Sequence, residues 1–383
     1  MDLEVTYADG WDGGVIGRMT PDRARSRDRG GSPYVTLIHD GPRLVAQVRV
    51  SREADRIEVV AHDEEGRRSA QLDLRGGGEV MVVRMVEAWG YRTGSSDADA
   101  TYRSVTYRRD GRCVTTHEPN GEGGGSYQTF GQATQPSVGR PMFGDWQEVI
   151  ALAGISATSL NGATAADALP LGSGEPWRPK GPFAPGDLTK LFTNGAAVQV
   201  FEREAEIAVV AAGQLALPSG KLIVMDPGYL WPGDDSTPLD GQPVSVPPGT
   251  YPVDLAIADK TVAAARLTIS ERPVRRWEMA LGPDQSLAEL QDGHFAGFGV
   301  DTGTASFTDA SVAYSLADAA DEASASLDAY SAEVGEHAMV MWHSGFGDGA
   351  YPVWLGRDAA GDIAVVIADM LVVEGRDEFI GGP

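Results

Sequence analysis

Three turns in the C-terminal half of the chain each place an aspartate near glycine. They are centred on Asp226, Asp301 and Asp348, in the stretches MDPGY, GVDTG and GDG. Glycine lets a ligand or a metal ion approach the backbone closely, and hard cations such as magnesium and calcium prefer carboxylate oxygens. If the turns converge, the three carboxylates form a divalent metal site, and Asp301, Asp348 and His343 become the catalytic candidates. The alternative is that Asp and Gly only shape tight turns.

A histidine and a serine stand next to the third turn. His343 and Ser344, taken with an aspartate, have the residue types of nucleophilic catalysis. However, the chain has no G-x-S-x-G nucleophile elbow, and successive residues of a strand point to opposite faces. The enzymatic alternative is therefore a metal-assisted hydrolase that uses His343 as the acid or base.

Aromatic residues gather in the sequence around the same turns. Two of them belong to repeated Gly-x-Tyr-Pro-Val motifs, at residues 249–253 and 349–353, which predict paired hairpins with matching corners. The proline predicts that each motif lies at a sheet edge or at a strand start. These aromatic side chains either pack in the core or line a cleft, and a cleft would indicate an accessory protein that binds a small molecule of a biosynthetic pathway. The ligand-binding candidates are Tyr229, Trp231, Tyr251, Trp342, Tyr351 and Trp354.

The elements that must position these residues are mostly strands. From residue 195 onward, short β-rich runs follow one another at the spacing of an antiparallel sheet or barrel, and residues 342–369 predict a hairpin. Residues 309–333 predict the one long helix of this region, with Asp309 as its cap. No βαβ alternation is present, which disfavours a parallel sheet. We expect a mainly β fold with some α (α+β), with a barrel-like or open antiparallel sheet in a C-terminal domain at 195–383.

The N-terminal part differs in composition from the C-terminal part. Residues 1–118 predict a smaller β-rich domain, whose clearest hairpin joins residues 103–109 and 112–116 through Asp110-Gly111. Residues 119–194 are rich in glycine and proline, which predicts a linker with short helices.

The charge of the chain excludes some classes of partner. The net charge is −24, and residues 1–140 carry 19 Arg, no Lys and 21 Asp or Glu, so about −22 falls on residues 141–383. Such an acidic half repels phosphate backbones, so we expect no nucleic-acid partner. No apolar run reaches the about 18–20 residues of a membrane span, and the N-terminus does not resemble a secretory signal. Cys113 is the single cysteine, which excludes an intrachain disulfide. The expected compartment is cytoplasmic.

Several motifs of the C-terminal half occur together in one order. They read LPSGKLIVMDP, PPGTYPVDLAIAD, RRWEMA, FGVDTGTASFTD and SGFGDGAYPVWLGRDAAGDIAVVIAD. In content and order they resemble the bacterial domain of unknown function 4241, from about residue 195 to residue 373. The resemblance implies a self-contained domain that can follow varied N-terminal partners, and it implies no activity, substrate or catalytic residue.

These observations favour a cytoplasmic, two-domain interaction protein over an enzyme. Its acidic C-terminal domain would meet a basic protein partner, as an immunity-type protein meets a basic toxin. We expect no cofactor, apart from the divalent metal of the hydrolase alternative. The sequence predicts no oligomeric state.

Overall fold

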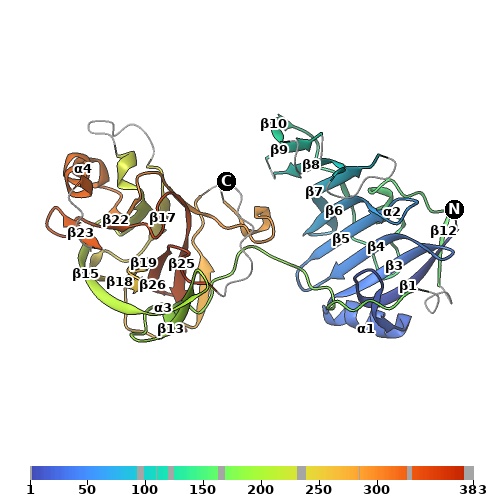
Figure 1. Cartoon of the computed structure of the whole chain (residues 1–383), viewed down its shortest axis with the longest axis horizontal. Helices are drawn as coiled ribbons and strands as arrows, with labels where there is room; N and C mark the ends of the chain where they lie inside the picture. The colour runs from blue at the N-terminus through green and yellow to red at the C-terminus, as the bar shows by residue number, and fades with distance from the viewer. Residues whose placement is uncertain are drawn as a thin grey trace. The chain divides into compact units, whose positions relative to one another are not determined.

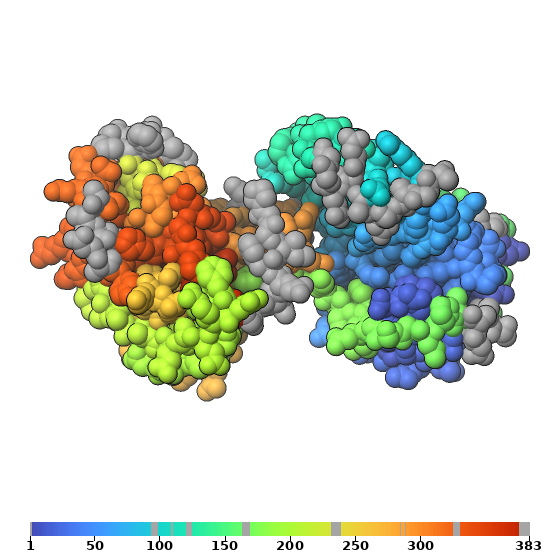
Figure 2. Space-filling model, viewed as in Figure 1, coloured from blue at the N-terminus to red at the C-terminus, as the bar shows by residue number. Residues whose placement is uncertain are grey.

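The computed structural model describes residues 2–92, 99–108, 110–119, 125–162, 169–230, 239–283, 285–325 and 330–374. About 50% of the chain is strand and about 11% is helix, which confirms a mainly β fold with some α. The chain divides into two compact units, Met1–Lys180 and Gly181–Pro383. Figure 1 shows both as ribbons and Figure 2 shows their atoms. Each unit is described by itself.

The N-terminal unit is built on one twelve-stranded sheet that largely follows chain order. The strand order is β10-β9-β8-β7-β6-β5-β4-β3-β1-β12, with β11 joined to β7 and β2 to β1. Only β1 and β12 pair in parallel among these described strands. The predicted hairpin at residues 103–116 is confirmed as β8 and β9, with Tyr107 opposite Cys113. The strands are β1 (Asp2–Trp11), β2 (Val15–Met19), β3 (Tyr34–Asp40), β4 (Arg43–Ser51), β5 (Arg56–His62), β6 (Arg68–Gly77), β7 (Val80–Gly90), β8 (Thr101–Tyr107), β9 (Arg112–Glu118), β10 (Tyr127–Gln132), β11 (Ser137–Gly139) and β12 (Ser159–Gly162).

The segment predicted as a linker contributes structure to this unit. It supplies β10, β11 and β12, and the short helix α2 (Gln147–Ala151). Trp146, Val149 and Ile150 are completely buried in the core of the unit. The division between the units falls after Lys180, whereas the predicted boundaries are at residues 118 and 194. The glycine and proline content of this segment predicted a flexible chain. However, its few large apolar side chains pack into the core of the N-terminal unit and so fix the segment to that unit.

The two faces of this sheet differ in chemistry because side chains alternate along each strand. One face packs against α2 and against α1 (Pro21–Gly30), around side chains such as Tyr34, Ile57 and Leu74. The other face carries a row of buried and half-buried polar contacts on the strands from β1 to β6, which we call the polar network. Its bonds are Thr6 Oγ1 to His39 Nε2 (3.0 Å), Gln47 Nε2 to His62 Nε2 (3.0 Å), Arg49 Nη1 to Glu58 Oε2 (2.7 Å), Arg56 Nε to Asp73 Oδ1 (2.7 Å) and Arg75 Nε to Asp73 Oδ2 (2.9 Å).

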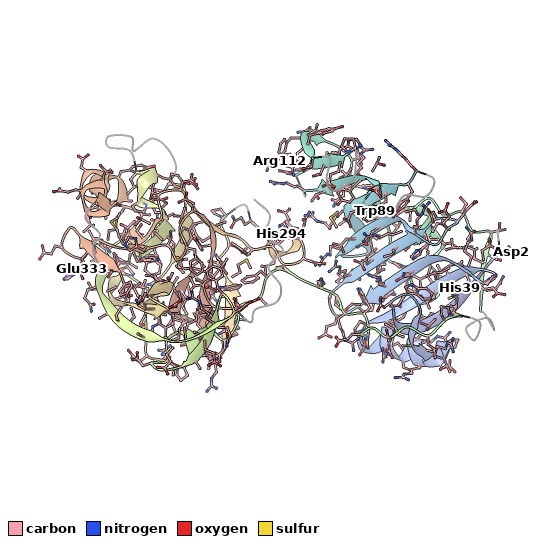
Figure 3. All side chains as sticks on the ribbon, viewed as in Figure 1. Asp2, His39, Trp89, Arg112, His294 and Glu333 are labelled. Atoms are coloured by element: carbon pink, nitrogen blue, oxygen red, sulfur yellow. The ribbon has the colours of Figure 1, made fainter. Side chains whose placement is uncertain are left out.

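His39, at the end of this network, makes the stability of the unit depend on pH (Figure 3). Its side chain is 1% exposed, and burial lowers its pKa from 6.5 to about 4. The imidazole of His39 takes up a proton at a higher pH in the unfolded chain than in the folded chain. The contribution of neutral His39 to the stability of the folded unit is therefore complete above pH 6.5 and is lost as the pH falls toward 4. Between about pH 7 and about pH 5 the free energy of unfolding should fall by about 2 kcal/mol through this group alone.

Urea unfolding of the wild type and of His39→Gln at both pH values measures this effect. Glutamine can still bond to Thr6 but does not titrate, so the stability difference between the two proteins should shrink at the lower pH. His62, whose pKa burial also lowers, is present in both proteins and cancels in this difference. An equal fall in both proteins would show that His39 is not the titrating group.

The C-terminal unit contains two larger sheets, a two-stranded β13–β14 hairpin and one covering helix. The seven-stranded sheet has the order β15-β18-β19-β26-β25-β20 with β21 joined to β25, and the five-stranded sheet has the order β17-β16-β22-β24-β23. The strands are β13 (Ala197–Val200), β14 (Arg203–Glu206), β15 (Ala208–Leu217), β16 (Lys221–Met225), β17 (Gln242–Ser245), β18 (Gly249–Ala258), β19 (Thr261–Thr268), β20 (Arg276–Met279), β21 (Gly297–Val300), β22 (Thr304–Asp309), β23 (Ser331–Val334), β24 (Met339–His343), β25 (Gly349–Arg357) and β26 (Ile363–Asp369). The α-helices are α3 (Leu188–Leu191) and α4 (Ala317–Ala325), and the 3-10 helices are η3 (Pro227–Tyr229), η4 (Leu287–Glu289) and η5 (Ala313–Leu316).

The two larger sheets and α4 form three layers. Val366 from the seven-stranded sheet and Phe307 from the five-stranded sheet belong to one shared core, so the sheets face each other. Alternate residues of the five-stranded sheet point outward, where Met341 packs with Ala317 and Ala320 of α4. The sheets are open over the described strands, so the barrel form of the prediction is not realised.

The long helix predicted at residues 309–333 is shorter than expected. It begins as η5, continues as α4 to Ala325, and is followed by β23. Asp309 is the last residue of β22 and does not cap the helix, because its carboxylate accepts bonds from Ser219 and Ser311 instead. Among the described residues, no helix is long and apolar enough to cross a membrane.

Candidate functional site

The three Asp-Gly turns of the C-terminal unit do converge, and Asp226 joins the first two of them. Asp226 follows β16, and its side chain is completely buried. Its carboxylate accepts bonds from Asp301 N (2.8 Å), Thr302 N (2.8 Å), Thr302 Oγ1 (2.6 Å) and Gly228 N (2.7 Å). The four donors occupy both carboxylate oxygens, so the Asp226 side chain links the first two turns by hydrogen bonds inside the protein.

The third turn is joined to the second by the backbone. Ser344 N donates to Gly303 O at 3.0 Å. Val300 pairs with Gly349, so Asp301 and Asp348, the next residues outward, lie at the same end of the β21–β25 pair. Both are exposed. The sequence leaves open whether these turns meet, and the structure brings them into contact.

The predicted metal site at Asp226, Asp301 and Asp348 is not formed. Among the described residues, no group of three or more His, Cys, Asp or Glu side chains is placed to hold a metal ion. The physical reason is that Asp226 is already saturated with hydrogen bonds. Asp301 accepts a bond from Tyr229 Oη at 2.7 Å, and this bond, followed by burial, raises the pKa of the Tyr229 hydroxyl.

The predicted catalytic neighbours also lie apart from one another. His343 is exposed at the end of β24, where it stands opposite Thr304. Ser344 is 1% exposed, and its hydroxyl donates to Gly347 O at 2.8 Å, which closes the third turn. A buried serine whose hydroxyl closes a turn is placed as a structural residue and not as a nucleophile.

Three of the six aromatic candidates are core residues. Trp342, Tyr351 and Trp354 are 0%, 6% and 1% exposed and belong to the core between the two sheets. Tyr251 is half-buried, and its hydroxyl donates to Pro247 O. Core packing rather than a cleft therefore explains these residues. Trp231 lies outside the described residues.

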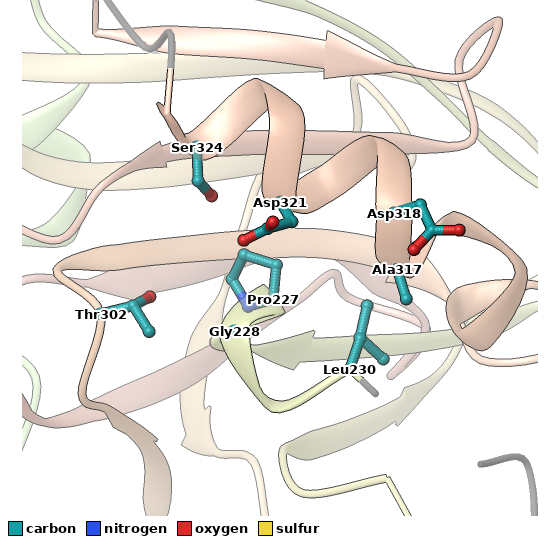
Figure 4. Close-up of a pocket in the computed structure, with 8 residues that line it drawn as sticks. All are labelled: Pro227, Gly228, Leu230, Thr302, Ala317, Asp318, Asp321 and Ser324. Carbon is teal, nitrogen blue, oxygen red and sulfur yellow. The ribbon is translucent and has the colours of Figure 1, made fainter. Parts of the chain in front are cut away.

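A cavity that the sequence did not predict lies beside the first two turns (Figure 4). It has a volume of about 310 Å3 and separates the turns around Asp226 from α4. Asp318 and Asp321, three residues apart and so on one face of α4, both line it. The complete lining is Pro227, Gly228, Leu230, Thr302, Ala317, Asp318, Asp321 and Ser324. The available sequence signal is the three-residue spacing of these two acids within the predicted helix.

The fold and the site define a mainly β protein whose C-terminal unit carries an acidic cavity between a helix and a cluster of turns. Residues 215–368 match the family described as Protein of unknown function (DUF4241), which confirms the resemblance of the C-terminal part of the chain. The match includes the three turns, α4 and both Gly-x-Tyr-Pro-Val motifs. Comparisons with curated proteins and with solved structures gave no match.

Proposed function

We propose that the chain is a binding protein whose C-terminal unit receives a basic protein partner, with a lysine or arginine side chain of the partner in the acidic cavity. The observation that carries this proposal is the lining of the cavity. Two carboxylates line it, and no Lys, Arg or His is present among the described lining residues. A positive group is the complement of such a surface.

The charge of the whole unit supports a basic partner. Residues 181–383 contain 30 Asp or Glu and 10 Lys or Arg, a net charge of −20. Five of these ten cations already form ion pairs within the unit, namely Arg203, Arg266, Arg272, Arg276 and Arg357. The resulting field attracts a basic protein and speeds its association. An immunity protein that neutralises a basic toxin is one protein of this kind.

The size and support of the cavity also suit a side chain. Its volume of about 310 Å3 is at the lower limit of ligand pockets, which span about 300–1,000 Å3. Its floor contains Gly228 and Thr302, which the buried Asp226 carboxylate holds in place. A floor that is already ordered reduces the entropy lost on binding.

The proposal is tested by removing the two cavity charges. A fluorescent peptide of alternating arginine and glycine is titrated with the full chain, and anisotropy gives the Kd. Asp318→Asn/Asp321→Asn should raise the Kd by about fivefold, because two contacts between opposite charges are lost. The effect should decrease as the NaCl concentration rises from about 50 mM to about 300 mM, because salt screens exposed charges.

A matched control separates the cavity from the overall field. Glu271→Gln/Glu336→Gln removes the same charge from two exposed residues that do not line the cavity, and it should change the Kd by less than about twofold. Equal weakening by both pairs of substitutions would mean that only net charge attracts the peptide, and the cavity would have no role in binding.

A further inference from the structure

Two phenylalanines of the C-terminal unit pack on each other at the surface. Phe201 and Phe346 are 61% and 52% exposed. Their ring centroids are 4.4 Å apart, and the rings are inclined by 34°. An exposed pair of large apolar side chains is unfavourable in water unless another molecule covers it.

The turn that carries Phe201 is held in place. Phe201 and Glu202 form the β13–β14 turn with φ angles of 47° and 60°, which bulky side chains rarely adopt. Glu374 fixes this turn, because its Oε1 accepts from Glu202 N and its own N donates to Gln199 O, both at 2.9 Å. Backbone strain of this kind persists only where the surrounding structure enforces it.

The turn that carries Phe346 is held equally firmly. Tyr351 Oη lies within hydrogen-bonding distance of Ser344 O (2.9 Å) and Gly347 O (2.6 Å), and Ser344 Oγ closes the same turn. Gly345 has φ of 60°, and a Cβ there would approach Met370 to 2.9 Å. Both aromatic rings are thus displayed on ordered turns.

Carboxylates flank this pair on both turns. Glu202 follows Phe201, Asp348 lies two residues after Phe346, and both are exposed. Gln199 and Glu374, which hold the Phe201 turn, also line a cavity of about 380 Å3 beside the hairpin. Its ionisable lining residues are Asp187, Lys190, Glu204 and Glu374, an excess of acids.

We propose that the Phe201–Phe346 pair is a second contact for the same basic partner and takes an arginine side chain. A guanidinium group stacks on aromatic faces and bonds to carboxylates at the same time, whereas a lysine ammonium is a compact, strongly hydrated charge. The pair is linked to the acidic cavity through the turns, because Thr302 lines the cavity and the next residue, Gly303, accepts from Ser344 N. This inference rests on the proposed function and assigns the partner a second anchor, an arginine.

The experiment compares two peptides, one of alternating arginine and glycine and one of alternating lysine and glycine. Wild type should bind the arginine peptide more tightly. Phe201→Ala/Phe346→Ala should weaken arginine-peptide binding by about fivefold and lysine-peptide binding by less than about twofold. Because no charge is removed, the salt dependence of the Kd should stay as in wild type. The control is Tyr127→Ala/Phe130→Ala, which removes two exposed aromatic residues of the N-terminal unit and should change neither Kd.

The outcomes distinguish this inference from the proposed function. If the phenylalanine variant binds both peptides as wild type does, while the Asp318/Asp321 variant is weakened, the second contact is refuted and the cavity proposal stands. If it loses both peptides equally, the pair does not select arginine and the inference is also refuted. If the Asp318/Asp321 variant and its charge-matched control bind alike, the proposed function fails, and the inference that rests on it fails too.

Discussion

Replacing Asp226 with alanine should lower the free energy of unfolding of the C-terminal unit by about 4 kcal/mol, because three backbone N–H groups and one hydroxyl lose a charged, buried acceptor. Hydrogen bonds to a charged group each contribute about 1.5–3 kcal/mol, and water that enters the vacated space recovers part of this. Urea unfolding followed by the fluorescence of the buried Trp342 and Trp354 measures the loss.

The neighbouring carboxylate is the control for this variant. Asp301→Ala should cost about 1 kcal/mol or less, because Asp301 is exposed and its carboxylate accepts a bond from the Tyr229 hydroxyl at the surface. If Asp226 were instead a metal ligand, Mg2+ or Ca2+ would stabilise the wild type and not Asp226→Ala. Such a metal effect, or a stability of Asp226→Ala equal to that of wild type, would contradict the structural role of Asp226.

Replacing Asp73 with alanine should destabilise the N-terminal unit by about 3 kcal/mol, because it leaves a buried guanidinium without its closest carboxylate. Asp73 bonds to Arg56 at 2.7 Å and to Arg75 at 2.9 Å, and Arg56 is only 4% exposed. Arg56 keeps its bond to Lys180 O and the more distant Glu58, which limits the loss. Native-state hydrogen exchange of the backbone amides of β5 and β6, measured at increasing urea concentrations, reports on this unit.

A double variant shows how much of this loss comes from the unpaired charge of Arg56 and how much comes from its other contacts. Arg56→Met/Asp73→Leu replaces both charges with apolar groups of similar size, which is often neutral for a buried ion pair. It should recover about half of the loss, because the bond from Arg75 to Asp73 is not restored. A double variant less stable than Asp73→Ala would show that Arg56 stabilises the unit through its other contacts.

The sequence predicted features that depend on local chemistry. Alternating residues around Asp110-Gly111 predicted the β8–β9 hairpin, and the repeated Gly-x-Tyr-Pro-Val motifs lie at corresponding positions near the starts of β18 and β25. The meeting of the three turns was left open by the sequence, because it depends on how strands distant in the chain pair.

Features that depend on contacts between distant segments could not be predicted. The residues around Asp226 in the sequence do not show that the N–H groups of Asp301 and Thr302 donate to its carboxylate. From the sequence alone, a carboxylate that joins two turns cannot be distinguished from a metal ligand. The acidic cavity exists because α4 packs beside η3, and the Phe201–Phe346 pair exists because two remote turns meet. Residues 119–194 have the average composition of a linker, yet Trp146 within them is completely buried. The average composition of a segment does not reveal one buried side chain.

The most direct test of the central claim is capture of the partner itself. The full chain is immobilised and exposed to a lysate of the organism that encodes it, beside the Asp318→Asn/Asp321→Asn variant and the Glu271→Gln/Glu336→Gln control. Wild type and the control should retain a basic protein at low salt, and the cavity variant should release it. Retention of no basic protein, or equal retention by all three baits, would show that the acidic cavity does not receive a basic partner.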